Sequence, residues 1–284
     1  MCAMLILHLG CVQSSYRYGI SNSDLLPKLP RTPNLITMGG QHPRIDSIER
    51  TVQYPRKVFR KWFPSKDPAE AIEPSVRRLQ AVQTATDYLD LNGLQGVYVD
   101  VYEYNPREQW NRLRNNSRIS PFWKYTGGTL YHLGYCLLPG RAFGTDRFNG
   151  FTNTLSVNST SSSNAVFHAG YVKKLYDQRY PGTYMAAGWL PIVPLVRDVS
   201  IANDVMTYAR VKQDWPLEKA LLPQVYGQLG GDTVAQATSI IPGAAYMPFY
   251  FRPLLSAAGG AIGSATGSAA VKRQESKMSN MERR

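Results

Sequence analysis

The sequence predicts a mainly α-helical chain with extended irregular segments and little β structure, forming a non-compact subunit of an assembly. Prolines recur through the first 66 residues and favour extended backbone there. Apolar residues at helical spacing follow, and a small-residue segment with almost no charge comes near the end. These patterns divide the chain into an extended, proline-rich basic arm (1–66), a helical central region with one probable strand (67–232), and an uncharged small-residue segment with a basic tail (233–284).

The arm is expected to lie on a partner, because its short apolar pieces between prolines cannot form a core of their own. The alternative is a surface loop region. Its most distinctive feature is a run in which cations alternate with aromatic side chains. Such a run suits RNA, an anionic membrane interface or an acidic protein surface. The predicted interaction residues in it are Arg56, Lys57, Phe59, Arg60, Lys61, Trp62 and Phe63.

The first clear helix is predicted to start at residues 67–70, where an aspartate, a proline and a glutamate stand at cap and first-turn positions. Pro74 is a second possible start. Asn92 and Gly93 are expected to end this helix. Its apolar stripe consists of Ile72, Val76, Leu79, Val82, Thr86 and Leu89.

Residues 96–104 read as a strand, because valines alternate there with tyrosines and an aspartate. A lone strand needs a pairing edge. We expect that edge either near residues 152–157 of this chain or on a neighbouring subunit. Asn105 and Pro106 then predict the start of a short basic helix.

The stretch 125–140 has no charged residue but is shorter than the roughly 20 residues that span a bilayer. We expect it to be a buried core segment, with placement at a membrane interface as the alternative. Two further helices are predicted over residues 165–178 and 197–212. A polar, serine-rich loop separates the first of them from the preceding segment.

Near its end, the chain has a single formal charge between residues 233 and 271, at Arg252. Gly259, Gly263 and Gly267 recur every fourth residue, a spacing that lets helices approach closely. Little bulky apolar surface accompanies these glycines, so a free amphipathic helix is not expected. The segment is predicted to be a close-approach segment ordered by a partner, with a flexible linker as the alternative.

No residue pattern in the sequence points to catalysis, a cofactor or a metal. The histidines do not stand at metal-ligand spacing, and we expect no histidine–cysteine pair other than His8 with Cys11. Asp100 with Glu103 could serve in acid–base chemistry, but no motif surrounds these carboxylates. Nucleotide-binding glycine loops and nucleophile elbows do not occur. We therefore predict no catalytic residues, no cofactor and no metal, and a protein that is not an enzyme.

The net charge of +12 favours an acidic partner. Our leading hypothesis is a non-catalytic structural or accessory subunit of a large intracellular multiprotein assembly, located at an organelle membrane and specifically the mitochondrial inner membrane. Its partners would be protein subunits and an anionic lipid surface. One alternative is a protein that lines the microtubule lumen of the axoneme in a cilium, with acidic tubulin as partner. Others are a ribonucleoprotein subunit, with nucleic acid a less favoured partner, and a viral structural subunit.

Overall fold

The computed structural model describes residues 16–40, 42–62, 72–138, 140–190, 192–240 and 251–282. The chain forms two compact units, which we describe separately. The sheet unit comprises Tyr18–Ala186, and the helical unit comprises Ala187–Arg284 together with residues 16–17. Helices dominate both, so the predicted mainly α chain with little β structure is confirmed.

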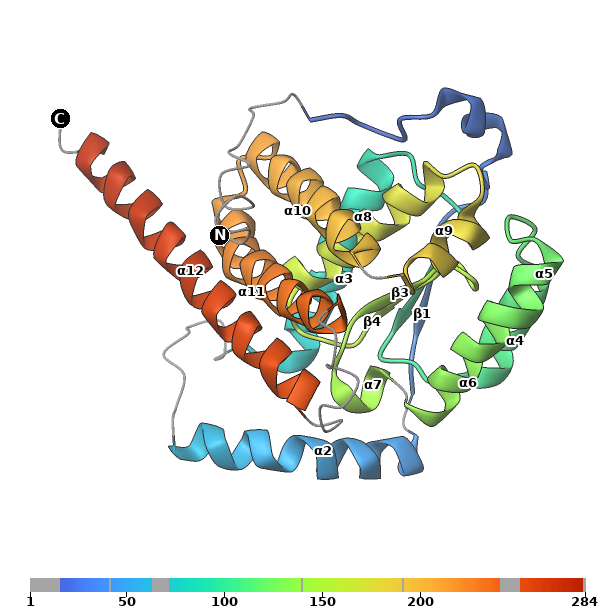
Figure 1. Ribbon diagram of the computed structural model, residues 1–284, viewed down its shortest axis with the longest axis horizontal. Coiled ribbons are helices and arrows are strands. Elements are labelled where there is room, and N and C mark those ends of the chain that lie inside the picture. Colours follow the sequence, from blue (N-terminus) through green and yellow to red (C-terminus); the bar gives the residue numbers. More distant parts are fainter. Residues whose placement is uncertain are drawn as a thin grey trace. The chain divides into compact units, whose positions relative to one another are not determined.

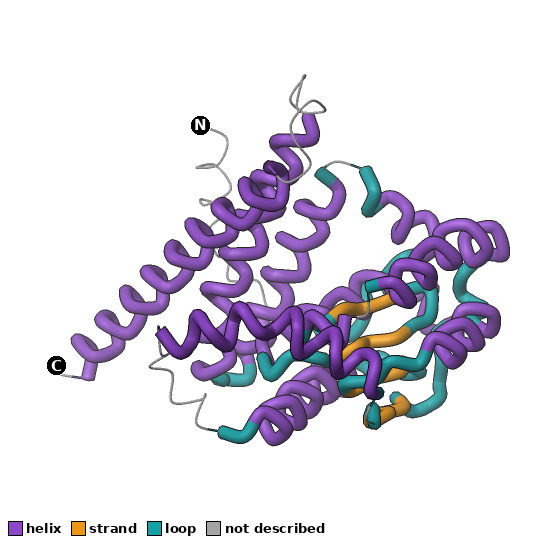
Figure 2. The backbone as a smooth tube through the Cα atoms, turned by 90° about the horizontal axis from the view of Figure 1, so that it is seen from below, coloured by secondary structure: helices purple, strands orange, loops and turns teal. Residues whose placement is uncertain are grey.

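The sheet unit is built around four short strands. In spatial order they are β1, β2, β4 and β3, of which the first three are parallel and β3 is antiparallel to β4 (Figures 1 and 2). Its elements are η1 (Ser23–Lys28), β1 (Leu35–Met38), α2 (Pro43–Trp62), α3 (Pro74–Leu91), β2 (Tyr98–Val101), α4 (Pro106–Asn115), α5 (Pro121–Trp123), the π-helical turn η3 (Lys124–Gly128), α6 (Thr129–Leu137), α7 (Gly140–Phe143), β3 (Arg147–Asn149), β4 (Thr154–Val157), α8 (Ser162–Tyr176) and α9 (Pro181–Ala187).

One face of the sheet is apolar and packs on α3 and α8. Alternate residues of a strand point to opposite faces, which places Val99 and Val101 of β2 on this side. Leu155 and Val157 of β4 stand directly opposite them in the parallel register. All four are buried, together with Tyr88 of α3. The core of the sheet unit therefore lies between β2, β4 and these two helices.

The ends of the predicted helices follow local capping chemistry. Helix α3 begins at Pro74, the second of the two expected starts, while the first lies outside the described residues. It ends at Asn92 and Gly93, and Gly93 has a φ of 63°, which favours glycine. Helix α4 begins after Asn105, whose side-chain oxygen accepts a hydrogen bond from the Glu108 amide at 3.1 Å.

The strand predicted at residues 96–104 pairs within this chain rather than with a neighbouring subunit. Its ordered part, β2, lies between β1 and β4, and β4 falls in the predicted region 152–157. The region expected to be an extended arm differs from the prediction, because it contains β1 and the 20-residue helix α2. Pro43 stands at the first position of α2, where proline is tolerated because that amide has no helical partner.

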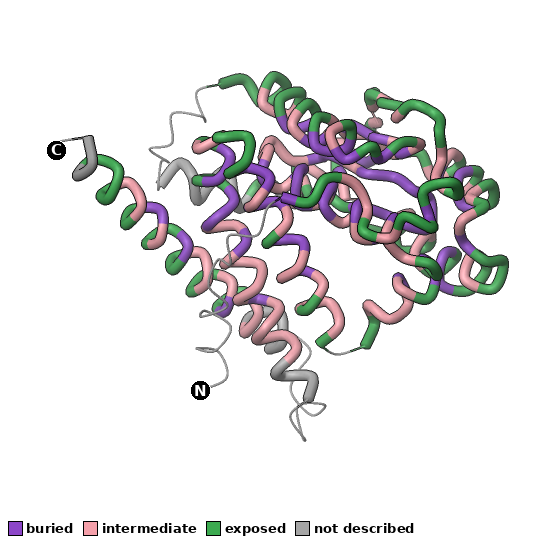
Figure 3. The backbone as a smooth tube through the Cα atoms, turned by 90° about the horizontal axis from the view of Figure 1, so that it is seen from above, coloured by how far each residue is buried: buried purple, intermediate pink, exposed green. Residues whose placement is uncertain are grey.

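The helical unit contains α10 (Val193–Val211), α11 (Trp215–Ile240) and α12 (Phe251–Glu282). Helix α10 covers most of the predicted helix 197–212. Helices α11 and α12 lie side by side (Figures 1 and 2). Residues 255–279 of α12 are mostly exposed or partly exposed, with buried positions at wide intervals (Figure 3).

Candidate functional site

The second face of the sheet is polar, and this is where the charged residues of the sheet unit gather. Tyr98 and Asp100 of β2 point to this side, next to Thr154 and Ser156 of β4 in the parallel register. Helix α4 covers this face, because its Arg112 reaches both Asp100 and Thr154. A polar strand face beneath a basic helix is the most site-like arrangement among the described residues.

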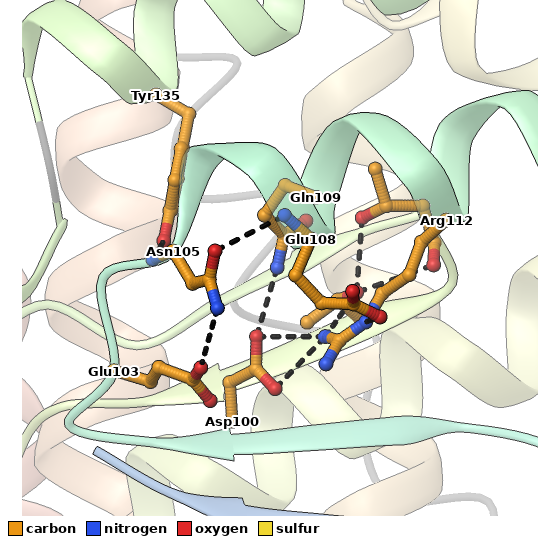
Figure 4. Close-up of polar contacts among 9 residues, drawn as sticks. Asp100, Glu103, Asn105, Glu108, Gln109, Arg112 and Tyr135 are labelled. Carbon is orange, nitrogen blue, oxygen red and sulfur yellow. Dashed lines mark hydrogen bonds and ion pairs between the residues drawn. The ribbon is translucent and has the colours of Figure 1, made fainter. Parts of the chain in front are cut away.

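Asp100 and Arg112 form a buried ion pair at the centre of the polar face (Figure 4). Arg112 Nη1 lies 2.8 Å from each oxygen of the Asp100 carboxylate, and Gln109 Nε2 donates to Oδ2 at 2.8 Å. The guanidinium also stacks over the ring of Tyr98, 4.3 Å from its centroid. Burial raises the pKa of Asp100, and the Arg112 charge and hydrogen bonds oppose that rise. The carboxylate is thus fully occupied by its own chain.

Glu103 lies beyond the end of β2, near the same cluster (Figure 4). Asn105 donates from Nδ2 to Glu103 Oε1 at 3.5 Å, while its backbone amide donates to the Tyr135 hydroxyl at 3.0 Å. Burial, and then the charge of Asp100, raise the pKa of Glu103. Its Oε2 is buried without a hydrogen-bond partner among the described residues. Of the carboxylates considered from the sequence, Glu103 is the one with a free buried oxygen.

A pocket opens beside Glu103, between the polar sheet face and helices α6 and α7. It encloses about 20 Å³, which is room for a single water molecule. A water there would be a suitable partner for the free oxygen of Glu103, and for Asn158 Oδ1, which is also buried and unpartnered within the described ranges. The lining residues are Glu103, Gln109, Tyr131, Tyr135, Leu138, Gly140, Arg141, Thr145, Arg147, Asn149, Ser156 and Asn158.

Helix α6 contains a histidine–cysteine pair that the sequence analysis missed. Cys136 Sγ lies 3.6 Å from His132 Nε2, and the spacing of four residues on a helix could have revealed the pair. Burial raises the pKa of the Cys136 thiol and lowers the pKa of His132. Both shifts favour the neutral forms, whereas a nucleophilic cysteine needs a thiolate. The predicted pair of His8 with Cys11 lies outside the described residues.

The continuous helical segment from α5 through η3 to α6 presents an uncharged apolar surface, which we call the outer face. It differs from the buried core segment expected for residues 125–140. Six of its large side chains are more than half exposed, at 54–70%. The outer face consists of the exposed residues Pro121, Phe122, Tyr125, Thr126, Thr129, Leu130, Leu133, Gly134, Leu137 and Leu138.

The opposite side of the same segment is anchored to the rest of the sheet unit. Trp123 Nε1 donates to Thr183 Oγ1 at 3.2 Å. Gly128 lies so close to α4 that a Cβ there would be 2.6 Å from Leu113 Cδ1. Tyr135 stacks on Tyr104 with ring centroids 5.3 Å apart. The exposure of the outer face therefore belongs to a helix that is held in place from behind.

The predicted glycine row of α12 packs against α11. A Cβ on Gly259 would lie 2.6 Å from the Gly230 carbonyl oxygen, and a Cβ on Gly267 would lie 2.6 Å from that of Leu222. Gly263 approaches the backbone of Tyr226 still more closely. The close approach expected from these glycines thus occurs within the chain, in an antiparallel pair of helices.

The predicted basic–aromatic run is only partly covered by the structure. Residues 56–62 lie on the backbone of α2, and their side chains are outside the described part. Phe63 is outside it altogether. The structure therefore leaves this run as a sequence-based hypothesis.

A carboxyl pair joins α10 to α11 in the helical unit. Burial, and then the charge of the neighbouring Asp198 carboxyl and the hydrogen bond to it, raise the pKa of Asp232 to about 7, although Arg197 opposes the rise. Arg197 Nε lies 3.4 Å from Asp198 Oδ1. The second oxygen of Asp232 is buried and has no hydrogen-bond partner in the part of the chain that the structure describes.

We expect this pair to make the helical unit less stable at high pH. Because the folded-state pKa of Asp232 exceeds its ordinary value of 3.8, its contribution to stability is present below about pH 4 and is lost as the pH rises through about 7. Asp232→Asn should remove the loss of stability that the ionisation of Asp232 causes. The thermal unfolding midpoint of the wild type should therefore fall relative to that of the variant between about pH 4 and pH 8. Asp204→Asn, on α10, is the control. Parallel pH profiles of Asp232→Asn and wild type would contradict the assignment.

Among the described residues, no helix combines the length and the apolar character that a membrane-spanning segment needs. No group of three or more histidine, cysteine, aspartate or glutamate side chains among them could hold a metal ion. Comparison of the chain with protein-family models, with curated proteins and with solved structures found no significant match.

Proposed function

We propose that the protein is a non-catalytic accessory subunit of a large intracellular assembly at an organelle membrane. The mitochondrial inner membrane is the location that we favour. In this proposal the outer face is the docking surface, and the sheet unit is the scaffold that presents it. The basic–aromatic run of α2 would add a second, cationic contact.

The outer face is the observation that carries the proposal. Its ten exposed residues include no charge and six large apolar side chains. Large exposed apolar patches on folded proteins mark interaction sites, because leaving them in water is unfavourable. The inner side of the segment is held by the stacking of Tyr135 on Tyr104 and by the hydrogen bond from Trp123 to Thr183. This packing favours a docking surface, because a loosely attached helix would lack such contacts.

The polar cluster supports the non-catalytic part of the proposal. Asp100 is saturated by Arg112 and Gln109, and the pocket beside Glu103 is of water size. Cys136 and His132 are shifted toward their neutral forms. The Asp100 carboxylate in particular is arranged as in a structural cluster, with its hydrogen-bonding capacity used inside the fold.

Native electrophoresis of cell extracts from the source organism tests the proposal. We expect the wild-type chain to migrate with a particle much larger than its own 31.8 kDa. The paired substitution Leu133→Gln and Leu137→Gln should release it from that particle, because both leucines are more than half exposed on the outer face and glutamine is polar but helix-compatible.

Leu79→Gln is the matched control, because Leu79 is a half-exposed leucine on α3, away from the outer face. It should leave the large particle intact. Migration of the wild-type chain as a monomer in the extract would contradict the proposal. So would substrate turnover by the purified chain that Glu103→Gln abolishes.

A further inference from the structure

We infer that the outer face binds an anionic membrane surface, with the segment 121–138 lying in the plane of the lipid–water interface. This inference rests on the proposed function and names the partner of its docking surface. It is argued from the chemistry of the outer face, from the charge around it, and from the way the helix is held.

The outer face offers a partner almost no directional polar contact. Its two threonines are already bonded to their own helix, with Thr126 Oγ1 donating to the Phe122 carbonyl at 2.7 Å and Thr129 Oγ1 to that of Lys124 at 3.3 Å. Protein interfaces typically combine an apolar centre with a polar rim that exchanges hydrogen bonds. An apolar face whose threonine hydroxyls are bonded inward, and whose other hydroxyl belongs to the exposed Tyr125, fits the boundary between headgroups and acyl chains better.

The charge beside the outer face complements an anionic surface. The sequence from Gln109 to Thr145 has no aspartate or glutamate. Helix α4 packs beside α6 and η3, and its exposed positions carry Arg107 and Arg114. Lys124 Nζ donates to the Arg114 carbonyl at 2.9 Å, which places this cation at the junction of α4 and η3. Cations that flank an apolar helix face bind lipid phosphates, and their attraction falls as salt screens it.

The segment is suited to lying on a membrane because it is already folded. Trp123, Tyr131 and Tyr135 face the sheet unit, where Tyr131 meets Phe151 with ring centroids 6.1 Å apart. The stretch from Pro121 to Leu138 is also shorter than the roughly 20 apolar residues that a spanning helix needs. Insertion of the outer face therefore requires no refolding and reaches only as deep as its side chains.

Vesicle flotation with the purified full-length chain tests the inference. The probes are vesicles of phosphatidylcholine alone and of phosphatidylcholine mixed with phosphatidylserine. We expect the wild type to float with the mixed vesicles at low salt, and to do so several-fold less with the neutral vesicles or at high salt. The triple variant Leu130→Gln, Leu133→Gln and Leu137→Gln should lose about tenfold in partitioning, or more, while Leu79→Gln floats as the wild type does. Arg114→Gln should weaken binding to the mixed vesicles selectively.

Circular dichroism of every variant should match the wild type, since each substituted side chain is exposed. The inference would be overturned if the folded wild type floated with neither vesicle type. It would also be overturned if the triple variant and Leu79→Gln lost the same amount of vesicle binding. If vesicle binding fails while the double leucine variant still leaves the large native particle, the partner of the outer face is a protein and the proposed function stands. If the particle is also unaffected, both proposals fail.

Discussion

Arg112→Met is expected to lower the free energy of unfolding of the sheet unit by about 3–5 kcal/mol. The substitution leaves the Asp100 carboxylate, whose side chain is 3% exposed, buried beneath α4 without its cation. Removing one member of a buried ion pair costs more than the pair contributes, because the remaining charge stays desolvated. Arg112 also donates to Thr154 of β4, so its loss loosens the contact between α4 and two strands.

The pH dependence of the Arg112→Met variant identifies the cause. Without Arg112, the influence that lowers the pKa of Asp100 most is gone, and burial holds that pKa above its ordinary value of 3.8. A raised folded-state pKa contributes stability at low pH and loses it as the pH rises. The deficit against wild type, measured by urea unfolding, should therefore shrink on acidification as the buried carboxyl takes up a proton.

A double-mutant cycle and a surface control complete this test. Combining Arg112→Met with Asp100→Asn should recover much of the loss, because a neutral amide then replaces the unpaired charge. Arg114→Met, on the exposed side of the same helix, should change stability by no more than about 0.5 kcal/mol. Additive effects of the two buried substitutions would show that the pair does not act as a unit.

Gly263→Ala is expected to separate α12 from α11 and to cost about 1–3 kcal/mol. The added Cβ would lie 2.7 Å from the Tyr226 carbonyl carbon and 3.2 Å from the Gly227 Cα. Both obstacles are backbone atoms, so no side chain can rotate away. The gain in helix propensity, about 1 kcal/mol, offsets only part of that cost. Hydrogen exchange of the α12 amides measures the separation directly.

Gly260→Ala, three residues away on the same helix, is the matched control. A Cβ there would meet one backbone atom within 4 Å, the Gly227 oxygen at 3.3 Å. Its effect on stability should be much smaller than that of Gly263→Ala, because this single contact requires a shift of only a few tenths of an ångström and the propensity gain opposes its cost. Equal acceleration of exchange in the two variants would show that helix propensity, and not close packing, controls α12.

The sequence predicts well the elements whose stabilising residues are neighbours along the chain. The alternating valines around Val99 specify β2, and Asn105 with Pro106 starts α4, because strand alternation and capping act over a few residues. Helix α3 ends at the predicted Asn92 for the same reason. Strand β1 was missed, since its four residues lie among prolines and are stabilised by pairing with β2.

The polar cluster could not be predicted as a cluster. Asp100 and Arg112 are each unremarkable in the sequence, and their contact depends on how α4 crosses the sheet. The glycine row of α12 predicted a close approach but not its partner, because small residues specify distance without specifying which helix comes near. Similarly, the uncharged stretch 125–140 concealed the difference between an inward aromatic side and an outward apolar side.

The π-helical turn at Lys124–Gly128 keeps the two halves of the outer face in phase. Such a turn inserts one residue into an α-helix, and each residue of an α-helix rotates the chain by about 100°. If the segment were α-helical throughout, the inward side of α6 would be rotated by that angle relative to Trp123. The direction in which Leu133 and Leu137 point thus depends on this turn absorbing its extra residue. Deleting that residue would leave a regular α-helix with the leucines in nearly their present direction, whereas keeping it in a regular α-helix would turn them by about 100°.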